Sequence, residues 1–248
     1  MITIYAVGLG PGGDDLLSPR ARNILEKCDT IAGYTTYLEL FPEIFADKNI
    51  ISSGMRGEIE RCKSGLDAAL EGKTVAVISS GDAGIYAMAG LLMELVEQEK
   101  YSGITVETIP GITAASAAAA LLGAPLMNDF AVISLSNLMT PDEIILKRLR
   151  GVAAAGMVCA LYNPGSIKRK TLIKEAVDIF IEAQGGETLV GIVHDASRAQ
   201  ERSQVTTLSE FPFADINMTT LVIIGNDQTV YRNHKLYNLR GYSEKYGK

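Results

Sequence analysis

The sequence predicts an α/β protein built from two α/β domains with mainly parallel sheets. Short β-branched runs alternate with longer helical patterns, which is typical of parallel strands joined by crossover helices. The chain has 248 residues, 47% of them hydrophobic, so it can bury a substantial core as one large or two small domains. Several of the expected strands end in glycine or serine, where ligand-binding loops of such sheets begin.

The first half of the chain is expected to contain four strands, at 2–7, 30–32, 74–79 and 106–109. Three helices are expected between and after them, at 19–27, 58–70 and 85–99. The first helix has a clear start signal, because Ser18 is a good N-cap and Pro19 suits the first helical position.

The second half repeats the pattern, with strands expected at 131–135, 157–161, 189–193, 204–207 and 221–224 and helices at 141–153 and 166–183. An alanine-rich helix at 113–122 separates the two halves and ends at Gly123. We therefore expect domains 1–112 and 113–248. The polar, tyrosine-rich stretch 226–248 has no clear period and is expected to be a surface tail or a subunit contact.

Charge and cysteine content exclude several classes of protein. The 23 basic and 29 acidic residues give a net charge of −6 without a block of Lys and Arg, so neither nucleic acid nor an anionic membrane is expected as a partner. Three cysteines without a C-x-x-C pair, and two histidines, argue against a zinc site or a disulfide framework. No metal site is therefore expected.

The most apolar long stretch, 112–127, is interrupted by polar residues, glycine and proline and is shorter than the ~20 residues that span a bilayer. The chain starts directly with a strand-like run and lacks the features of a signal peptide. A cytoplasmic location is expected.

A glycine loop follows the first strand and fits the pattern G-x-G-x-x-G from Gly8 to Gly13. A dinucleotide site needs a helix to start at the last glycine, but the helix signal at Ser18 comes five residues later. Asp14 and Asp15 lie in between and would repel a diphosphate. NAD is therefore disfavoured, which leaves a flat, uncharged or cationic ligand, or a simple tight turn.

A second loop, Ser80-Gly81-Asp82, follows another predicted strand and is expected at the same edge of the sheet. Asp82 is either the N-cap of the next helix or a ligand contact, and both roles remain open.

Five motifs in order resemble the tetrapyrrole (corrin/porphyrin) methylase family over nearly the whole chain. They are Val7-Gly8-Leu9-Gly10-Pro11-Gly12, Ser80-Gly81-Asp82, Pro110-Gly111-Ile112-Thr113-Ala114, Leu161-Tyr162-Asn163-Pro164 and Thr219-Thr220-Leu221-Val222-Ile223-Ile224-Gly225. The resemblance implies a two-domain, tetrapyrrole methylase-like fold that binds S-adenosyl-L-methionine in the interdomain cleft. It also implies a tetrapyrrole substrate and a homodimer.

Within the family, the chain is most similar to the precorrin-3B C(17)-methyltransferase branch of cobalamin biosynthesis. The similar segments are 33–37, 54–61, 116–126 and 240–242. This resemblance implies methyl transfer to C-17 of precorrin-3B or cobalt-precorrin-3, with ring contraction. The chain has Asn128 and Asn137 where members of this branch usually have histidine and aspartate, so proton-transfer roles at these two positions are in doubt.

The resemblance carries the cofactor contacts to nine positions, namely Pro11, Ser80, Gly81, Asp82, Ile85, Thr113, Ala114, Tyr162 and Ala196. Candidates for acid or base chemistry during ring contraction are Asp129, Glu58 and Asp195. Asn128 is a further candidate, at the position where the family branch usually has histidine. An acidic tetrapyrrole calls for arginines, because guanidinium binds carboxylate in a bidentate manner. The candidates are Arg56, Arg61, Arg198 and Arg202, each of which can instead be an ordinary surface arginine.

Other activities in the superfamily remain as alternatives, foremost the cobalamin-pathway methylases that act at C-11 or C-20. Methylation of ribosomal RNA is disfavoured by the acidic charge. A binding module without methyl transfer would share the glycine loop but would not need an arginine-lined cleft.

Overall fold

The computed structural model describes residues 2–54, 57–165 and 170–247. The chain divides into two compact units, Met1–Ala114 (unit 1) and Ala115–Lys248 (unit 2). The boundary expected from the sequence lies two residues earlier, after residue 112. The α/β class is confirmed in both units.

Unit 1 contains a five-stranded sheet with the order β3-β2-β4-β1-β5, in which every neighbouring pair is parallel. Its strands are β1 (Ile2–Gly8), β2 (Thr30–Tyr34), β3 (Asn49–Ser53), β4 (Val75–Ser79) and β5 (Ile104–Ile109). Because all five run in one direction, their carboxyl ends share one edge of the sheet, where the ligand loops of such folds lie.

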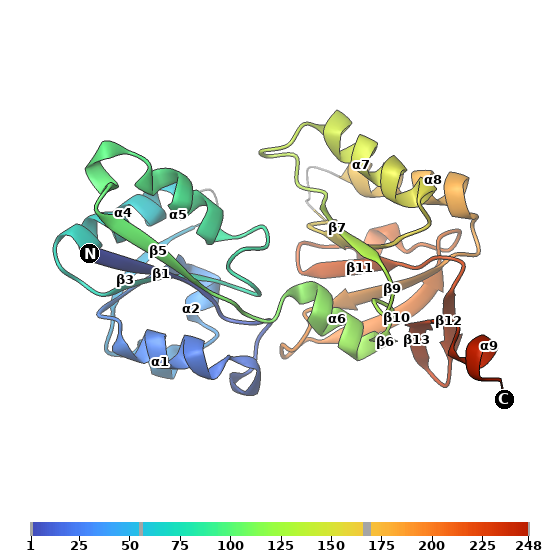
Figure 1. Cartoon of the computed structure of the whole chain (residues 1–248), viewed down its shortest axis with the longest axis horizontal. Coiled ribbons are helices and arrows are strands. Elements are labelled where there is room, and N and C mark those ends of the chain that lie inside the picture. Colours follow the sequence, from blue (N-terminus) through green and yellow to red (C-terminus); the bar gives the residue numbers. More distant parts are fainter. Residues whose placement is uncertain (1, 55–56, 166–169, 248) are drawn as a thin grey trace. The chain divides into compact units, whose positions relative to one another are not determined.

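Helices cover both faces of this sheet, as Figure 1 shows. Successive side chains of β1 point to opposite faces of the sheet, so this strand contributes to one hydrophobic core on each face. Ile4 and Ala6 pack against α4 and α5, whereas Val7 packs on the side of α1. The helices of unit 1 are α1 (Pro19–Lys27), α2 (Thr35–Leu38), α3 (Pro42–Phe45), α4 (Glu58–Leu70) and α5 (Met88–Val96), with 3-10 turns η1 (Asp14–Leu16) and η2 (Glu99–Tyr101).

The sequence predicted α1 and α4 with the observed bounds. It missed β3, an edge strand whose side chains are mostly exposed or half-buried and which therefore lacks an apolar run. It also placed the start of α5 at residue 85, whereas Met88 is the first helical residue and Ala87 provides no side-chain cap.

Unit 2 contains a second five-stranded sheet, with the order β10-β9-β11-β8-β7. The expectation of a mainly parallel sheet is wrong here, because only β7 and β8 form a parallel pair and the other three pairs are antiparallel. The strands are β7 (Phe130–Ser134), β8 (Val158–Tyr162), β9 (Leu189–His194), β10 (Arg202–Thr207) and β11 (Thr220–Ile224). The carboxyl ends of β7, β8 and β9 therefore share an edge with the amino ends of β10 and β11.

The helices α7 (Asp142–Ala154) and α8 (Lys170–Gln184) lie side by side on one face of this sheet (Figure 1). They enclose an apolar core in which Leu149 and Phe180 are fully buried. The opposite face meets α6 (Ala114–Leu122), and the absence of a side chain at Gly191 allows this contact, since a Cβ there would lie 2.4 Å from Leu122 Cδ1.

The stretch 226–248, expected to be a surface tail or a subunit contact, contains a folded hairpin. Strands β12 (Thr229–Arg232) and β13 (Lys235–Asn238) pair across Asn233 and His234, whose positive φ angles of 51° and 58° suit a two-residue hairpin turn. Strand β13 also pairs with β6 (Gly123–Ala124), and α9 (Tyr242–Tyr246) follows, while the short 3-10 turn η3 (Phe213–Asp215) precedes β11. The partner strand β6 lies about a hundred residues away in sequence, so local patterns do not reveal this sheet.

Candidate functional site

Three glycines meet at the carboxyl edge of the sheet in unit 1: Gly8 ends β1, Gly81 follows β4 and Gly111 follows β5. A Cβ added to Gly8 would lie 2.7 Å from both Gly111 N and Gly81 O, and one added to Gly111 would lie 2.2 Å from Gly81 O. Real side chains do not tolerate such contacts with backbone, so glycine is required at Gly8 and Gly111. The loops after β1, β4 and β5 thus cross with only backbone between them.

Backbone hydrogen bonds hold these loops in place. Gly10 and Gly81 exchange N–H···O bonds of 3.0 and 2.7 Å, and Leu9 N–H donates to Ser79 O at 2.9 Å. Pro11 is buried within the same loop. Helix α1 begins only at Pro19, after the turn η1, so several residues separate its amino terminus from the glycines. A dinucleotide site would instead need the helix to start at the last glycine of the loop.

Asp82 connects two of the loops. Its Oδ1 accepts a hydrogen bond from Gly84 N–H at 2.8 Å, and its Oδ2 accepts one from Gly111 N–H at 3.1 Å. The expected role as N-cap of the next helix is wrong, because α5 starts at Met88 without a side-chain cap. The segment between Asp82 and Met88 is instead a set of bends that leaves Ile85 39% exposed.

Thr113 and Ala114 lie beside Gly81, since a Cβ on Gly81 would be 3.9 Å from Thr113 Cα and 3.7 Å from Ala114 N. Unit 1 therefore brings seven of the nine predicted cofactor residues to one edge of its sheet. These are Pro11, Ser80, Gly81, Asp82, Ile85, Thr113 and Ala114.

The other two predicted contacts lie at the corresponding edge of the sheet in unit 2, where Tyr162 is the last residue of β8 and Ala196 follows β9. The Tyr162 hydroxyl accepts a 2.8 Å hydrogen bond from Ala115 N–H at the start of α6. Ala196 lies between Asp195 and Ser197, whose φ angles of 47° and 61° are in the left-handed region. Both residues are half-buried.

The predicted arginines occupy different environments. Arg61, in the first turn of α4, is only 5% exposed and donates from Nη1 to Ser53 Oγ at 2.6 Å. Within the ranges 2–54, 57–165 and 170–247, no carboxylate forms an ion pair with it, and its Nε lacks a hydrogen-bond partner. Arg56 lies outside the described residues, and Arg198 is half-buried in the loop after β9.

Arg202 is held by Asp215 through two short bonds of 2.7 and 2.6 Å. This guanidinium also keeps the pKa of Asp215 below its usual value. A bidentate pair of this kind already uses the face of the guanidinium that would bind a substrate carboxylate, so the expected substrate role of Arg202 does not fit the structure.

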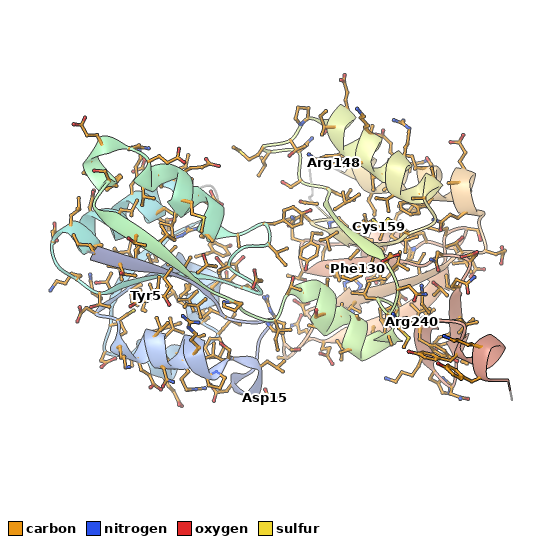
Figure 2. The ribbon with its side chains drawn as sticks, viewed as in Figure 1. Tyr5, Asp15, Phe130, Arg148, Cys159 and Arg240 are labelled. Atoms are coloured by element: carbon orange, nitrogen blue, oxygen red, sulfur yellow. The ribbon has the colours of Figure 1, made fainter. Side chains whose placement is uncertain are left out.

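The candidate acid–base residues are divided between the two units. Glu58 begins α4, near the loop edge of unit 1. Asn128 and Asp129 precede Phe130, the first residue of β7, whose neighbour β8 contains Cys159 (Figure 2). They lie at the amino edge of this sheet, roughly 16 Å along β7 from its carboxyl end at the strand rise of 3.3 Å per residue.

Asn128 has a structural partner, because its Nδ2 donates to Leu239 O at 2.9 Å. The pair Asn128 and Asp129 is therefore remote, within unit 2, from the loops of Tyr162 and Ala196. The acid–base role expected for Asp129, and the role of Asn128 at the position of the family's usual histidine, stay predictions.

Sequence reasoning missed a buried polar cluster around His194, the last residue of β9. The imidazole is 1% exposed and lies 2.9 Å from Thr220 Oγ1 and 3.3 Å from Asp215 Oδ2. The only signal in the sequence is that His194 directly precedes Asp195 and Ala196 at the end of a strand.

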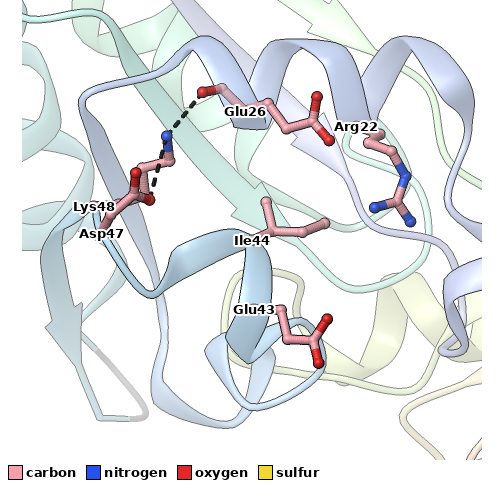
Figure 3. A pocket seen from close by; sticks show the side chains of 6 residues that line it. All are labelled: Arg22, Glu26, Glu43, Ile44, Asp47 and Lys48. Carbon is pink, nitrogen blue, oxygen red and sulfur yellow. Dashed lines mark hydrogen bonds and ion pairs between the residues drawn. The ribbon is translucent and has the colours of Figure 1, made fainter.

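A surface pocket of about 350 Å³ lies between α1 and the segment 43–48 (Figure 3). It is lined by Arg22, Glu26, Glu43, Ile44, Asp47 and Lys48, and Lys48 Nζ donates to Glu26 O at 2.8 Å across it. Among the described residues, none of those predicted to contact cofactor or substrate lines this pocket. The pocket is therefore separate from the loops in which Gly8, Gly81 and Gly111 meet.

The described residues offer neither a metal site nor a membrane span. They contain no group of three or more side chains suited to hold a metal ion. No helix formed by them has the length and apolar character needed to cross a membrane.

Comparisons with known proteins point to one family. Residues 3–212 match the model of the Tetrapyrrole (Corrin/Porphyrin) Methylases. A protein of Salmonella typhimurium named probable cobalt-factor III C(17)-methyltransferase is 43% identical over 240 residues, which cover 97% of this chain and 99% of the relative.

Solved structures show the same likeness. The crystal structure of the methyltransferase CobJ superposes with a TM-score of 0.90 and 33% identity, over 95% of this chain and 99% of that one. The uroporphyrin-III C-methyl transferase of Thermus thermophilus complexed with S-adenyl homocysteine shares the fold, with a TM-score of 0.69, 23% identity and coverage of 90% and 96%. From the family match and the full-length relative, the chain belongs to the tetrapyrrole (corrin/porphyrin) methylase family.

Proposed function

We propose that this protein transfers the methyl group of S-adenosyl-L-methionine to C-17 of precorrin-3B or cobalt-precorrin-3 and couples this transfer to contraction of the macrocycle. The similarity to the C(17)-methyltransferase of Salmonella typhimurium supports the reaction. The observation that carries the proposal is the close contact of Gly8, Gly81 and Gly111, which holds the loops after β1, β4 and β5 together at the sheet edge where ligands of such folds bind.

The residues present fit the methyl donor better than a dinucleotide. The loops offer a partly exposed apolar side chain at Ile85 and a carboxylate at Asp82. A cationic donor suits this carboxylate, whereas a diphosphate would be repelled by it and by the exposed Asp14 and Asp15. When bound, S-adenosylmethionine supplies a methyl carbon on a positively charged sulfur, from which a nucleophilic ring carbon takes the methyl group.

The main task of the protein residues is to hold the reactants in line. Orientation of this kind can contribute roughly 7–11 kcal/mol to lowering the barrier. Methyl transfer then needs neither a metal nor a catalytic triad from the protein. Ring contraction, which extrudes C-20, moves protons, and Glu58 is the predicted acid or base whose position at the loop edge of unit 1 suits this step.

Arg61 is proposed to bind an acidic substituent of the tetrapyrrole. A buried guanidinium without a carboxylate partner among the described residues is costly unless an anion compensates its charge. Its place in the first turn of α4 brings it to the same edge of the sheet as Glu58. The replacement Arg61→Met is expected to raise KM for the tetrapyrrole more than KM for the methyl donor.

A homodimer is also proposed, because aromatic residues that favour interfaces are exposed on the hairpin and the last helix. Tyr231, Tyr242 and Tyr246 are 46%, 56% and 70% exposed. Light scattering at micromolar concentration should give twice the chain mass, and a monomer mass would contradict this proposal.

The decisive experiment incubates the protein with S-adenosylmethionine carrying a ¹³C methyl group and with metal-free or cobalt-loaded precorrin-3 forms. Mass spectrometry should show one added methyl group, and ¹³C NMR should place it at C-17 of a contracted ring. A methyl group at C-11 or C-20 would contradict the proposed position. Calorimetric binding of NAD in place of S-adenosylhomocysteine would contradict the methyl-donor site itself.

A further inference from the structure

His194 ends a row of side chains that face the core of unit 2. Val190 and Ile192 precede it on the same side of β9 and are completely buried beneath α7 and α8. The imidazole continues this row at the carboxyl end of the strand, directly before Asp195 and Ala196. A buried titratable group thus adjoins the loop that carries a predicted cofactor contact.

Two side chains lie close to the nitrogens of the imidazole. Its Nδ1 lies 2.9 Å from Thr220 Oγ1, and Thr220 is itself 4% exposed. Its Nε2 lies 3.3 Å from Asp215 Oδ2, but the two are not aligned for a hydrogen bond. Asp215 is further bound to Arg202.

These contacts determine the tautomer of the neutral ring. A proton on Nε2 faces the Asp215 carboxylate, whereas a lone pair there would be repelled by it. Nδ1 is then an acceptor, so the single hydrogen of the Thr220 hydroxyl points to His194. Asn217 Oδ1, 2.9 Å from the same hydroxyl, meanwhile accepts from the N–H and the Oγ1 of Thr219, each at 2.9 Å.

A second proton on the imidazole would reverse this arrangement. Nδ1 would become a donor to Thr220 Oγ1, and the Thr220 hydroxyl would turn its hydrogen toward Asn217 Oδ1. The state of His194 is therefore transmitted to the segment 217–220 by one rotating hydroxyl group.

This segment touches both predicted cofactor loops of unit 2. Asp195 N–H donates to Thr219 O at 3.2 Å, next to the left-handed residues on either side of Ala196. Gly165, which follows the Tyr162 loop, lies so close to Asn217 that an added Cβ would be 2.4 Å from its Cα. A change at Thr220 thus reaches both loops through backbone contacts.

We propose that His194 is a positioning residue for the methyl-donor site: its neutral ring accepts from Thr220 and keeps the Asp195–Ser197 loop in the binding conformation, and a second proton on the ring, by reversing this hydrogen bond, shifts the loop away from that conformation. The inference rests on the proposed function, because Ala196 is the predicted donor contact. Three charged groups face the ring, namely Arg202 from β10, Asp215 from η3 and Asp195 from its own strand end. Burial, aided by Arg202, lowers the pKa of His194 and so favours the neutral ring, which the two carboxylates oppose.

The test measures S-adenosylhomocysteine affinity by calorimetry between about pH 8 and about pH 5, across the ordinary titration range of histidine. The wild-type affinity should fall by about fivefold or more toward low pH, the lower end of typical coupling between two sites. His194→Ala should bind weakly at every pH. His194→Asn, whose Oδ1 still accepts from Thr220, should restore affinity with a flat pH profile.

His234→Asn is the matched control, because His234 is the other histidine of the chain and asparagine suits its positive φ in the hairpin turn. It should keep the wild-type pH profile. A pH profile of His194→Asn equal to that of the wild type would overturn the proposal.

A second readout needs no ligand. In NMR spectra of the free protein, the amide signals of Asp195, Ala196 and Ser197 should titrate together with the His194 ring and stop titrating in His194→Asn. Amide signals of these three residues that do not titrate with the His194 ring would overturn the inference. Failure of the wild type to bind S-adenosylhomocysteine at about pH 8 would contradict the proposed function alone, and the amide signals would still decide the role of His194.

Discussion

Asp82 binds the backbone of Gly111: its Oδ2 accepts the Gly111 N–H at 3.1 Å while its Oδ1 accepts the Gly84 N–H at 2.8 Å. One carboxylate thus joins the loop after β4 to the loop after β5. The sequence left the role of Asp82 open between a helix cap and a ligand contact. In the structure, its side chain links the loops after β4 and β5 through hydrogen bonds to their backbone.

Asp82→Ala is expected to lower both stability and affinity for S-adenosylhomocysteine. Two backbone N–H groups lose their acceptor, which should cost about 1–3 kcal/mol in the free energy of unfolding. Urea unfolding and calorimetry measure the two effects, and Asp129→Ala, at an exposed position, serves as the control. Unchanged affinity together with lowered stability would restrict Asp82 to a purely structural role.

Gly8→Ala and Gly90→Ala form a matched pair of glycine substitutions in unit 1. The Cβ at Gly8 would meet backbone at 2.7 Å, so we expect a loss of about 1–3 kcal/mol in unfolding free energy and loss of donor binding. Gly90 lies within α5 with nothing within 4 Å of the added Cβ, so the same change should stabilise by about 0.5–1 kcal/mol. Equal thermal melting of the two variants would contradict the close crossing of the loops.

Asn128→His tests the departure from the usual histidine of the family branch. Because Asn128 lies at the amino edge of β7 and binds Leu239 O, we expect no increase in ring contraction, measured by product mass and absorption spectrum. Asn128→Ala should cost about 1 kcal/mol through the lost hydrogen bond. A gain of about 100-fold in contraction alone for the histidine variant would instead assign this position a role in acid–base catalysis.

Stability should decrease as the pH falls through the titration of His194. Burial lowers the pKa of this imidazole below the ordinary value of 6.5, so the unfolded chain takes up the proton at a higher pH than the folded chain does. The free energy of unfolding is therefore undiminished above pH 6.5 and falls below it, until the folded state also binds the proton. Urea unfolding should show this fall in the wild type and in His234→Asn, and a smaller one in His194→Asn.

The three cysteines should be unreactive in the folded protein. Burial raises the pKa of Cys28 to about 12, of Cys62 to about 11 and of Cys159 to about 12, and the thiolate is the reactive form. A chromogenic disulfide reagent should therefore modify none of them at neutral pH and all three in denaturant. Rapid modification of the native protein would show that one of these core positions opens.

The sequence by itself determined the features that depend on local chemistry. Helices α1 and α4 have the predicted bounds because their end signals and apolar spacing act within a few residues. The glycine loops after β1 and β4 were also recognisable, because glycine after a strand indicates where backbone must pass closely. The ordered motifs were sufficient to indicate the family that the comparisons then showed.

Only the tertiary structure decided features that depend on distant partners. The direction of β9 and β11 and the pairing of β13 with β6 follow from which strands meet in the fold, and a strand-like run looks the same in either direction. Distant partners also explain why two arginines proposed for substrate binding differ in the structure. Arg202 is bound to Asp215, whereas Arg61 is buried without an acidic partner among the described residues. His194 acquired its role in the same way, because Thr220 and Asp215 reach it only after the strands have paired.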